Sequence, residues 1–176
     1  MKIFLLSTCL GALLCCSFTL LGTWRIGDDY HVKFDGRGAS GTFEGLRGTV
    51  IFDPDRPAAG QLDVTVDVAT IDTGNATKNR HATGEGWFDA ARYPTIGFRS
   101  TAISATRSGY TATGELTLHG TTRPVSFPFT FTSRPDGGLF EGSFEVNRKD
   151  YGIEGSFGQF MVSSTLTVSL RVPVTE

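Results

Sequence analysis

The sequence predicts an all-β fold of about eight antiparallel strands, arranged either as a closed barrel or as a two-sheet sandwich. Apolar and polar residues alternate along most of the chain, as they do in strands with one buried face. Short connections rich in glycine, proline and aspartate separate most of these runs, which favours antiparallel neighbours. The only helical pattern falls inside one long connection. The chain also contains 14 phenylalanines among its 176 residues, and the inward faces of the runs are almost wholly apolar.

The first residues predict an export signal. Lys2 is followed by a short apolar run, the pattern of a signal peptide rather than of a membrane span. We expect residues 1–22 to form this signal, with cleavage between residues 17 and 22, and residues 23–176 to form one domain in the periplasm or outside the cell. Lipid attachment at Cys16 is the alternative, although Leu14 and Cys15 stand before it in place of the pair of small residues that a lipid-attachment site usually has. All three cysteines lie in or beside the signal, so the mature fold is expected to need no disulfide.

Three strands are expected before the long connection. In the first, Tyr30, Val32 and Phe34 alternate with polar neighbours, and a glycine-rich turn at residues 36–41 ends it. The third strand alternates valine with aspartate and threonine, which is typical of an antiparallel strand with one face exposed to solvent. The predicted ranges are Trp24 to Phe34, Phe43 to Phe52 and Leu62 to Val68.

Five more strands are expected after the long connection. Turns are predicted between them, including one at residues 120–124. Pro128 falls on the polar side of its run, where the missing backbone donor indicates a sheet edge or a bulge. The last run alternates most regularly. The predicted ranges are Thr95 to Ser104, Tyr110 to His119, Val125 to Phe131, Leu139 to Val146 and Val162 to Val172.

The long connection, Ile71 to Thr101, indicates a lid. It is too polar and irregular at its centre to be another strand, and a connection of this length in a compact domain is usually functional. Its second half carries the bulky side chains of Trp87 and Phe88, so it has apolar groups to bury as well as polar groups to solvate. Short helical turns are expected between residues 78 and 92. Residues 147–160 form a second irregular segment.

The sequence offers no positive sign of catalysis, of a metal or of nucleic acid. His31, His81 and His119 are too far apart to match a zinc-ligand spacing. The sequence contains no serine in a nucleophile elbow, and no cysteine nucleophile is expected in the mature chain. The 16 basic and 18 acidic residues give a net charge of −2, which does not favour nucleic acid or an anionic membrane surface as a partner.

Several blocks of the sequence resemble, in order, the YceI-like family of exported, lipocalin-like proteins that bind polyisoprenoid lipids. Together they span nearly the whole chain after the signal. The blocks are Trp24 to Ile26, Ile71 to Asp89, Tyr93 to Ser100, Gly114 to Val125 and Asn147 to Ile153.

This resemblance implies an eight-stranded antiparallel lipocalin-like barrel with a short helical lid insertion and an apolar tunnel for an isoprenoid or similar chain. It agrees with the apolar inward faces read from the alternation, because a long hydrocarbon needs an apolar wall and little polar recognition. We expect the wall to include these residues of the strands and the lid: Val64, Val66, Trp87, Phe88, Tyr93, Phe98, Leu116, Leu118, Phe127, Phe129, Phe144 and Val146.

A lipid head group is expected near a mouth of the barrel, because a buried polar group without a partner costs several kcal/mol. The candidate residues that could meet it are basic or carry an amide: Asn75, Asn79, Arg80, His81, Arg148 and Lys149. The ordinary alternative for these side chains is solvation or salt bridges to nearby aspartates.

The favoured function is therefore carriage or sequestration of a long-chain apolar lipid, such as a polyisoprenoid or a quinone, without a metal or another cofactor. Two alternatives stay open at this point: an enzyme or redox accessory that acts on a quinone-like lipid, and a structural barrel filled by its own side chains. A homodimer also stays open.

Overall fold

The computed structural model describes residues 22–155 and 161–176. The predicted signal segment, including Cys16, lies outside the described residues except for Gly22.

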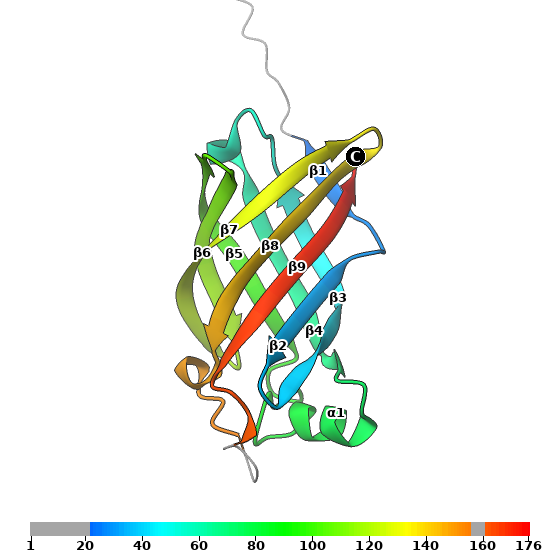
Figure 1. Cartoon of the computed structure of the whole chain (residues 1–176), viewed down its shortest axis with the longest axis vertical. Helices are drawn as coiled ribbons and strands as arrows, with labels where there is room; N and C mark the ends of the chain where they lie inside the picture. The colour runs from blue at the N-terminus through cyan, green and yellow to red at the C-terminus, as the bar shows by residue number, and fades with distance from the viewer. Residues whose placement is uncertain (1–21, 156–160) are drawn as a thin grey trace, which may run out of the picture.

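The chain forms a closed antiparallel β-barrel of eight strand positions with one short helix, α1, beneath one end (Figure 1). Consecutive strands pair in chain order from β2 to β9, and β9 closes the ring by pairing with β2. The prediction of an eight-stranded lipocalin-like barrel is confirmed, and the sandwich is excluded. The strands are β1 Thr23–Ile26, β2 His31–Gly36, β3 Ala39–Ile51, β4 Gln61–Asp72, β5 Thr95–Thr106, β6 Gly109–Leu118, β7 Thr121–Arg134, β8 Gly137–Asn147 and β9 Thr165–Thr175; the helical elements are η1 Pro57–Ala59, α1 Ala76–Thr83 and η2 Arg148–Tyr151.

The first strand position is divided between β1 and β2. Trp24 of β1 pairs with β3, and Ile26 pairs with Val174 of β9. Further along, β2 lies between the same two strands. The expected continuous strand from Trp24 to Phe34 is therefore wrong, because the chain leaves the ladder at residues 27–30 and re-enters it.

The turn between β6 and β7 is tighter than the sequence indicated. His119 and Gly120 have φ values of 51° and 70°, the left-handed pair that a two-residue hairpin turn requires. β7 starts directly afterwards at Thr121. The expected turn at residues 120–124 is therefore too long, because His119 supplies the first left-handed residue.

β7 and β8 pair along only part of their length. Their ladder extends from Arg134 to Phe129, which faces Gly142. Beyond this point β7 is paired with β6 and β8 with β9, and no pairing joins residues 121–128 to 143–147 of the described chain. Pro128 lies where the ladder stops, in keeping with the expected edge position. η2 follows β8 at this end, and Arg123 Nε of β7 donates to the Asp150 carbonyl (2.6 Å).

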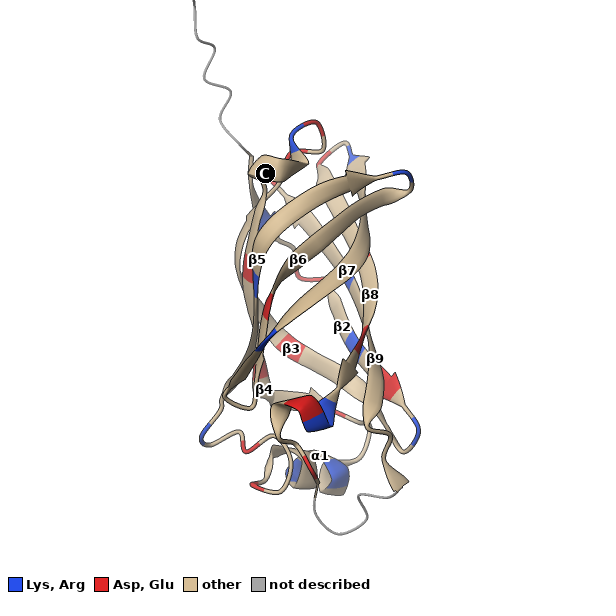
Figure 2. Ribbon diagram, turned by 90° about the vertical axis from the view of Figure 1, so that its left-hand side faces the viewer, with Lys and Arg blue, Asp and Glu red and all other residues tan. Residues whose placement is uncertain are grey.

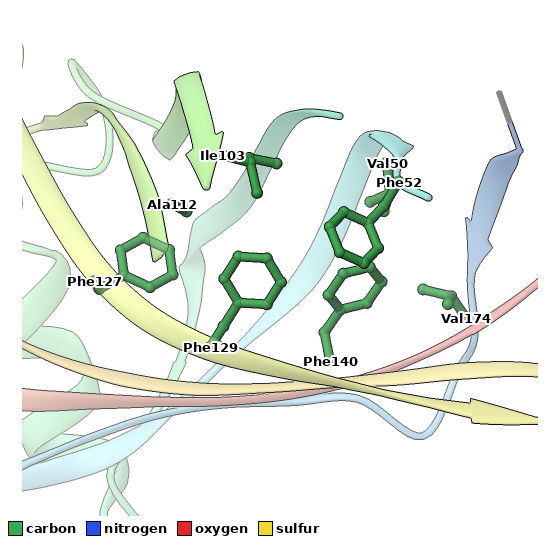
Figure 3. Close-up of a cluster of buried hydrophobic side chains, with 8 residues drawn as sticks. All are labelled: Val50, Phe52, Ile103, Ala112, Phe127, Phe129, Phe140 and Val174. Carbon is green, nitrogen blue, oxygen red and sulfur yellow. The ribbon is translucent and has the colours of Figure 1, made fainter. Parts of the chain in front are cut away.

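One end of the barrel is sealed by aromatic side chains (Figure 3). Phe52 is 1% exposed, and its ring lies 5.6 Å from that of Phe129 and 5.3 Å from that of Phe140. Trp24 of β1 packs against Phe131 at the same end (5.6 Å between centroids). α1 and η2 lie beneath the opposite end (Figure 1). The barrel is thus plugged at one end and covered by irregular segments at the other.

Candidate ligand-binding cavity

A cavity of about 580 Å³ occupies the barrel between the aromatic plug and the lid. Its volume lies in the range of about 300–1,000 Å³ that is usual for small-molecule sites. The barrel is therefore not completely filled by its own side chains. The wall includes these expected residues: Val64, Val66, Trp87, Phe88, Phe98, Leu116, Leu118, Phe127, Phe129, Phe144 and Val146.

Tyr93 was expected on the wall, but the structure places it outside the cavity. Its ring lies 4.7 Å from that of His119, and the Arg92 guanidinium lies 5.2 Å from its centroid. His119 in turn lies with Nδ1 3.1 Å from the Tyr151 carbonyl oxygen. Tyr93 thus belongs to a contact between the lid connection, the β6–β7 turn and η2.

Further apolar wall residues lie on the strands that carry the expected ones and on β2, β3 and β9, and we had not assigned them to the cavity from the sequence. The same period-2 alternation marks them, so the signal was present in the sequence. What alternation does not reveal is which inward residues face empty space and which meet another side chain. These additional apolar wall residues from β2, β3, β4, β5, β8 and β9 include Val32, Phe34, Phe43, Leu62, Ile96, Phe140, Leu166, Val168 and Leu170.

The closed end of the cavity is the inner surface of the aromatic plug. Phe127, Phe129 and Phe140 line the cavity and also belong to the buried cluster at the sealed end. Phe127 stacks on Phe144 with centroids 4.7 Å apart and planes at 20°. These two rings come from β7 and β8, in the part of the barrel where the two strands no longer pair.

The lid presents a face with both polar and apolar groups to the cavity. Asn75 caps α1, because its Oδ1 accepts hydrogen bonds from the backbone N–H groups of Thr77 (3.0 Å) and Lys78 (3.1 Å). Lys78, His81 and Ala82 all line the cavity. Their i, i+3, i+4 spacing places them on one side of the helix.

The connection after α1 brings Trp87 and Phe88 under the barrel. The Phe88 ring meets that of Phe43 edge to face at 5.6 Å. Trp87 packs beneath Arg148, whose guanidinium carbon lies 5.1 Å from the ring centroid. The two aromatic side chains of the lid therefore contact both β3 and η2.

Arg148 of η2 lines the cavity and is 4% exposed. Its Nη1 donates to the carbonyls of Ile153 (2.5 Å) and Glu154 (2.7 Å), and its Nε donates to that of Ser163 (3.2 Å). Removal from water lowers the pKa of Arg148, and the charge of Glu154 partly opposes this shift. The side chain therefore fastens the segment after η2 while it carries a positive charge at the cavity wall.

The other head-group candidates lie away from the cavity wall. Asn79 Oδ1 accepts from the N–H and hydroxyl of Thr73 (2.9 and 2.6 Å), and its Nδ2 donates to Asp72 Oδ1 (3.2 Å). Hydrogen bonds from the Gly74 N–H and from Asn79 lower the pKa of Asp72. Arg80 Nη2 donates to Thr77 Oγ1 (3.2 Å), and Lys149 is exposed. The structure thus brings His81 and Arg148 to the cavity, and it adds Lys78.

The described residues contain no group of three or more His, Cys, Asp or Glu side chains that could hold a metal ion. Within the same part of the chain, no helix is long and apolar enough to cross a membrane.

Comparison with known proteins gives the barrel a family context. A model of the YceI-like domain matches residues 26–174. A UPF0312 protein of Photorhabdus laumondii is 31% identical over 137 residues, which cover 74% of this chain and 71% of the relative. A UPF0312 protein of Pseudomonas savastanoi is 36% identical over 122 residues, which cover 65% and 64%.

Solved structures share the same architecture. The crystal structure of BcnA from Burkholderia cenocepacia superposes with a TM-score of 0.78 at 27% identity, over 84% of this chain and 96% of that protein. A YceI protein of Campylobacter jejuni gives a TM-score of 0.69 at 20% identity, over 100% and 99%. A polyisoprenoid-binding domain from Saccharophagus degradans gives 0.64 at 13% identity, over 89% and 99%.

Proposed function

The chain belongs to the YceI-like domain family, and from this premise we propose that it is an exported protein that holds the long apolar chain of a polyisoprenoid, a quinone or a similar amphiphile in its barrel. Its role is carriage or sequestration of that lipid rather than chemical conversion. A structural relative from Saccharophagus degradans is described as a polyisoprenoid-binding domain, which supports this ligand class.

The observation that carries the proposal is the apolar cavity between the plug and the lid. Its side walls consist mainly of Val, Leu, Ile and Phe side chains, and each methylene group that leaves water there contributes about 0.8 kcal/mol. A chain of ten methylenes would then gain roughly 8 kcal/mol before the cost of its immobilisation. The wall therefore supplies affinity for a hydrocarbon without a dense set of polar contacts.

The plug gives the bound lipid a direction. Phe127, Phe129 and Phe140 form the closed end of the cavity, so the apolar end of the lipid points toward them. The head group then lies at the lid, near His81 and Arg148, where polar side chains reach the cavity. In this arrangement Asn75 caps α1, Asn79 and Arg80 are residues of α1 that do not line the cavity, and Lys149 is exposed beside Arg148.

Native mass spectrometry of the protein purified from its own source tests this proposal. We expect an added mass of one lipid on the natural chain. The cavity-filling variants Val64→Phe and Leu116→Trp should lose that mass, whereas Glu115→Trp, on the exposed face of the same strand as Leu116, should keep it. Far-UV circular dichroism checks that each variant is folded. A natural chain without added mass, or cavity variants that retain it, would count against the proposal.

The export part of the proposal has its own measurement. The intact mass of the mature protein should show loss of residues 1 to between 17 and 22, and the protein should be recovered in the periplasm or the medium. A lipid-modified amino terminus at Cys16 would show as extra mass after protein denaturation. Recovery of the full chain in the cytosol would contradict export.

A further inference from the structure

The basic side chains of the cavity wall gather at the lid end, whereas its acidic side chain lies elsewhere. The basic residues on its described wall are Lys78, His81 and Arg148, all at the lid end. Its acidic residue, Glu141, is exposed on β8 and lies opposite Arg171 of β9. The carboxylate thus sits on the outside of the barrel, while the three basic groups gather where a head group would lie.

Helix α1 supplies two of these groups and has no acidic residue of its own. Its sequence from Ala76 to Thr83 contains Lys78, Arg80 and His81, and Figure 2 shows blue on this helix, in the lower coil at its label. Among the described residues, the ion pairs lie elsewhere on the barrel and involve neither Lys78 nor His81.

The nearest acidic side chain before α1 is already engaged. Asp72 Oδ1 accepts hydrogen bonds from the Gly74 N–H (2.8 Å) and from Asn79 Nδ2 (3.2 Å). Both bonds turn this carboxylate toward the start of the helix. Lys78 and His81 are both exposed, and within the described chain their side chains make no hydrogen bond or ion pair, so their donors are available to a ligand at this end of the cavity.

An anionic head group suits this end of the cavity for two physical reasons. A carboxylate or phosphate placed there meets donors on cationic or titratable groups, and such hydrogen bonds are stronger than those between neutral groups. The Arg148 guanidinium is held at the wall by backbone carbonyls. Its charge therefore adds to the positive potential at this end without a rearrangement of the side chain. A neutral alcohol or quinone head would gain much less from this potential.

We propose that the ligand is an amphiphile with one apolar chain and an anionic head, either a carboxylate or a phosphate, which Lys78 and His81 contact while the chain lies against the apolar wall. This inference rests on the proposed function, because it specifies the head of a lipid that the cavity must first hold. It also identifies Lys78 as a specificity-determining residue.

The test compares three probes that share one chain and differ in the head: hexadecanoate, hexadecyl phosphate and hexadecanol. Each displaces the neutral fluorescent probe N-phenyl-1-naphthylamine from the delipidated protein. We expect one or both anions to bind about tenfold more tightly than the alcohol at low salt, the effect of one charge-assisted hydrogen bond. This advantage should shrink as the ionic strength rises. The tighter of the two anions identifies the source, a fatty acid or a lipid phosphate.

Two variants and a matched control locate the effect. Lys78→Gln and His81→Gln should each weaken binding of the preferred anion about three- to tenfold, a markedly larger loss than either causes for hexadecanol. Arg80→Gln removes a positive charge from the same helix at a residue that does not line the cavity, and it should change anion binding less than twofold.

Equal affinity of the natural protein for the alcohol and both anions would overturn the inference while leaving lipid binding intact. An equal loss in Arg80→Gln and Lys78→Gln would also overturn it, because it would reflect net charge rather than contact. If none of the three probes displaces the fluorophore, the proposed function itself fails and the inference fails with it.

Discussion

Arg148 joins parts of the chain that the strands alone would leave apart. Its guanidinium donates to carbonyls of residues 153 and 154 on one side and of residue 163 on the other. Trp87 of the lid connection packs against it. A buried carbonyl that loses its donor costs about 1–3 kcal/mol, so this residue stabilises the lid end independently of any ligand.

We therefore predict that Arg148→Met lowers the free energy of unfolding by about 3 kcal/mol, since several carbonyls lose their donor together. Arg148→Lys should lose somewhat less, because an ammonium group keeps the charge but cannot reproduce the planar fork. Urea unfolding measured by fluorescence gives both values. Unchanged stability in Arg148→Met would show that these bonds are not important for folding, and Lys149→Met, at an exposed neighbour, provides the control.

At the scale of elements, α1 depends on a cap rather than on an apolar stripe. The helix has eight residues and no buried one, and isolated helices of this length are marginal in water. Asn75 satisfies two of its free N–H groups, and Asn79 ties it to Thr73 and Asp72. Two residues that the sequence presented as head-group candidates are thus occupied in holding the helix that carries Lys78 and His81.

Asn75→Ala should destabilise α1 by about 1 kcal/mol, the usual cost of a lost N-cap. Amide hydrogen exchange should show faster exchange in residues 76–83 and little change in the barrel strands, because the helix opens locally. Asn75→Ser should retain most of the protection, since a serine hydroxyl also caps. Uniform acceleration across the barrel would instead indicate that α1 unfolds only with the whole domain.

Taken as a whole, the molecule divides its interior into a packed end and a hollow end. Phe52 meets rings on several sides within the plug, whereas Phe98 has Phe127 on one side and the cavity on the other. A side chain surrounded by others leaves a larger new void when it is truncated. The plug therefore accounts for more stability per residue than the cavity wall.

Phe52→Ala should accordingly cost about 3–5 kcal/mol of unfolding free energy, and Phe98→Ala at least about 1 kcal/mol less than that. Chemical denaturation of the delipidated protein measures both. Lipid binding should weaken more in Phe98→Ala, which removes part of the wall. A larger loss of stability at Phe98 than at Phe52 would contradict this division of the interior.

The alternation of residues by itself determined that the chain is an antiparallel all-β domain, because a period of two fixes which side of a strand is buried. It located eight strand positions, with errors where the chain leaves the ladder between Trp24 and Phe34, where β3 already begins at Ala39 inside the expected turn at residues 36–41, and where the chain turns at His119. The sequence also showed the family resemblance through ordered blocks. These features are local, so neighbouring residues carry enough information to reveal them.

The alternation left three points open that the family resemblance implied only in part and the tertiary structure decided: that the sheet closes, that its interior is hollow between the aromatic plug and the lid, and which polar groups reach the cavity. Closure depends on pairing β2 with β9, which come from opposite ends of the described chain, and no local pattern encodes that pairing. Lys78 and Asn75 look alike as exposed polar residues in the sequence, yet one lines the cavity and the other caps the helix. Their roles differ because the direction of a side chain and its neighbours are set by the packing of α1 under the barrel.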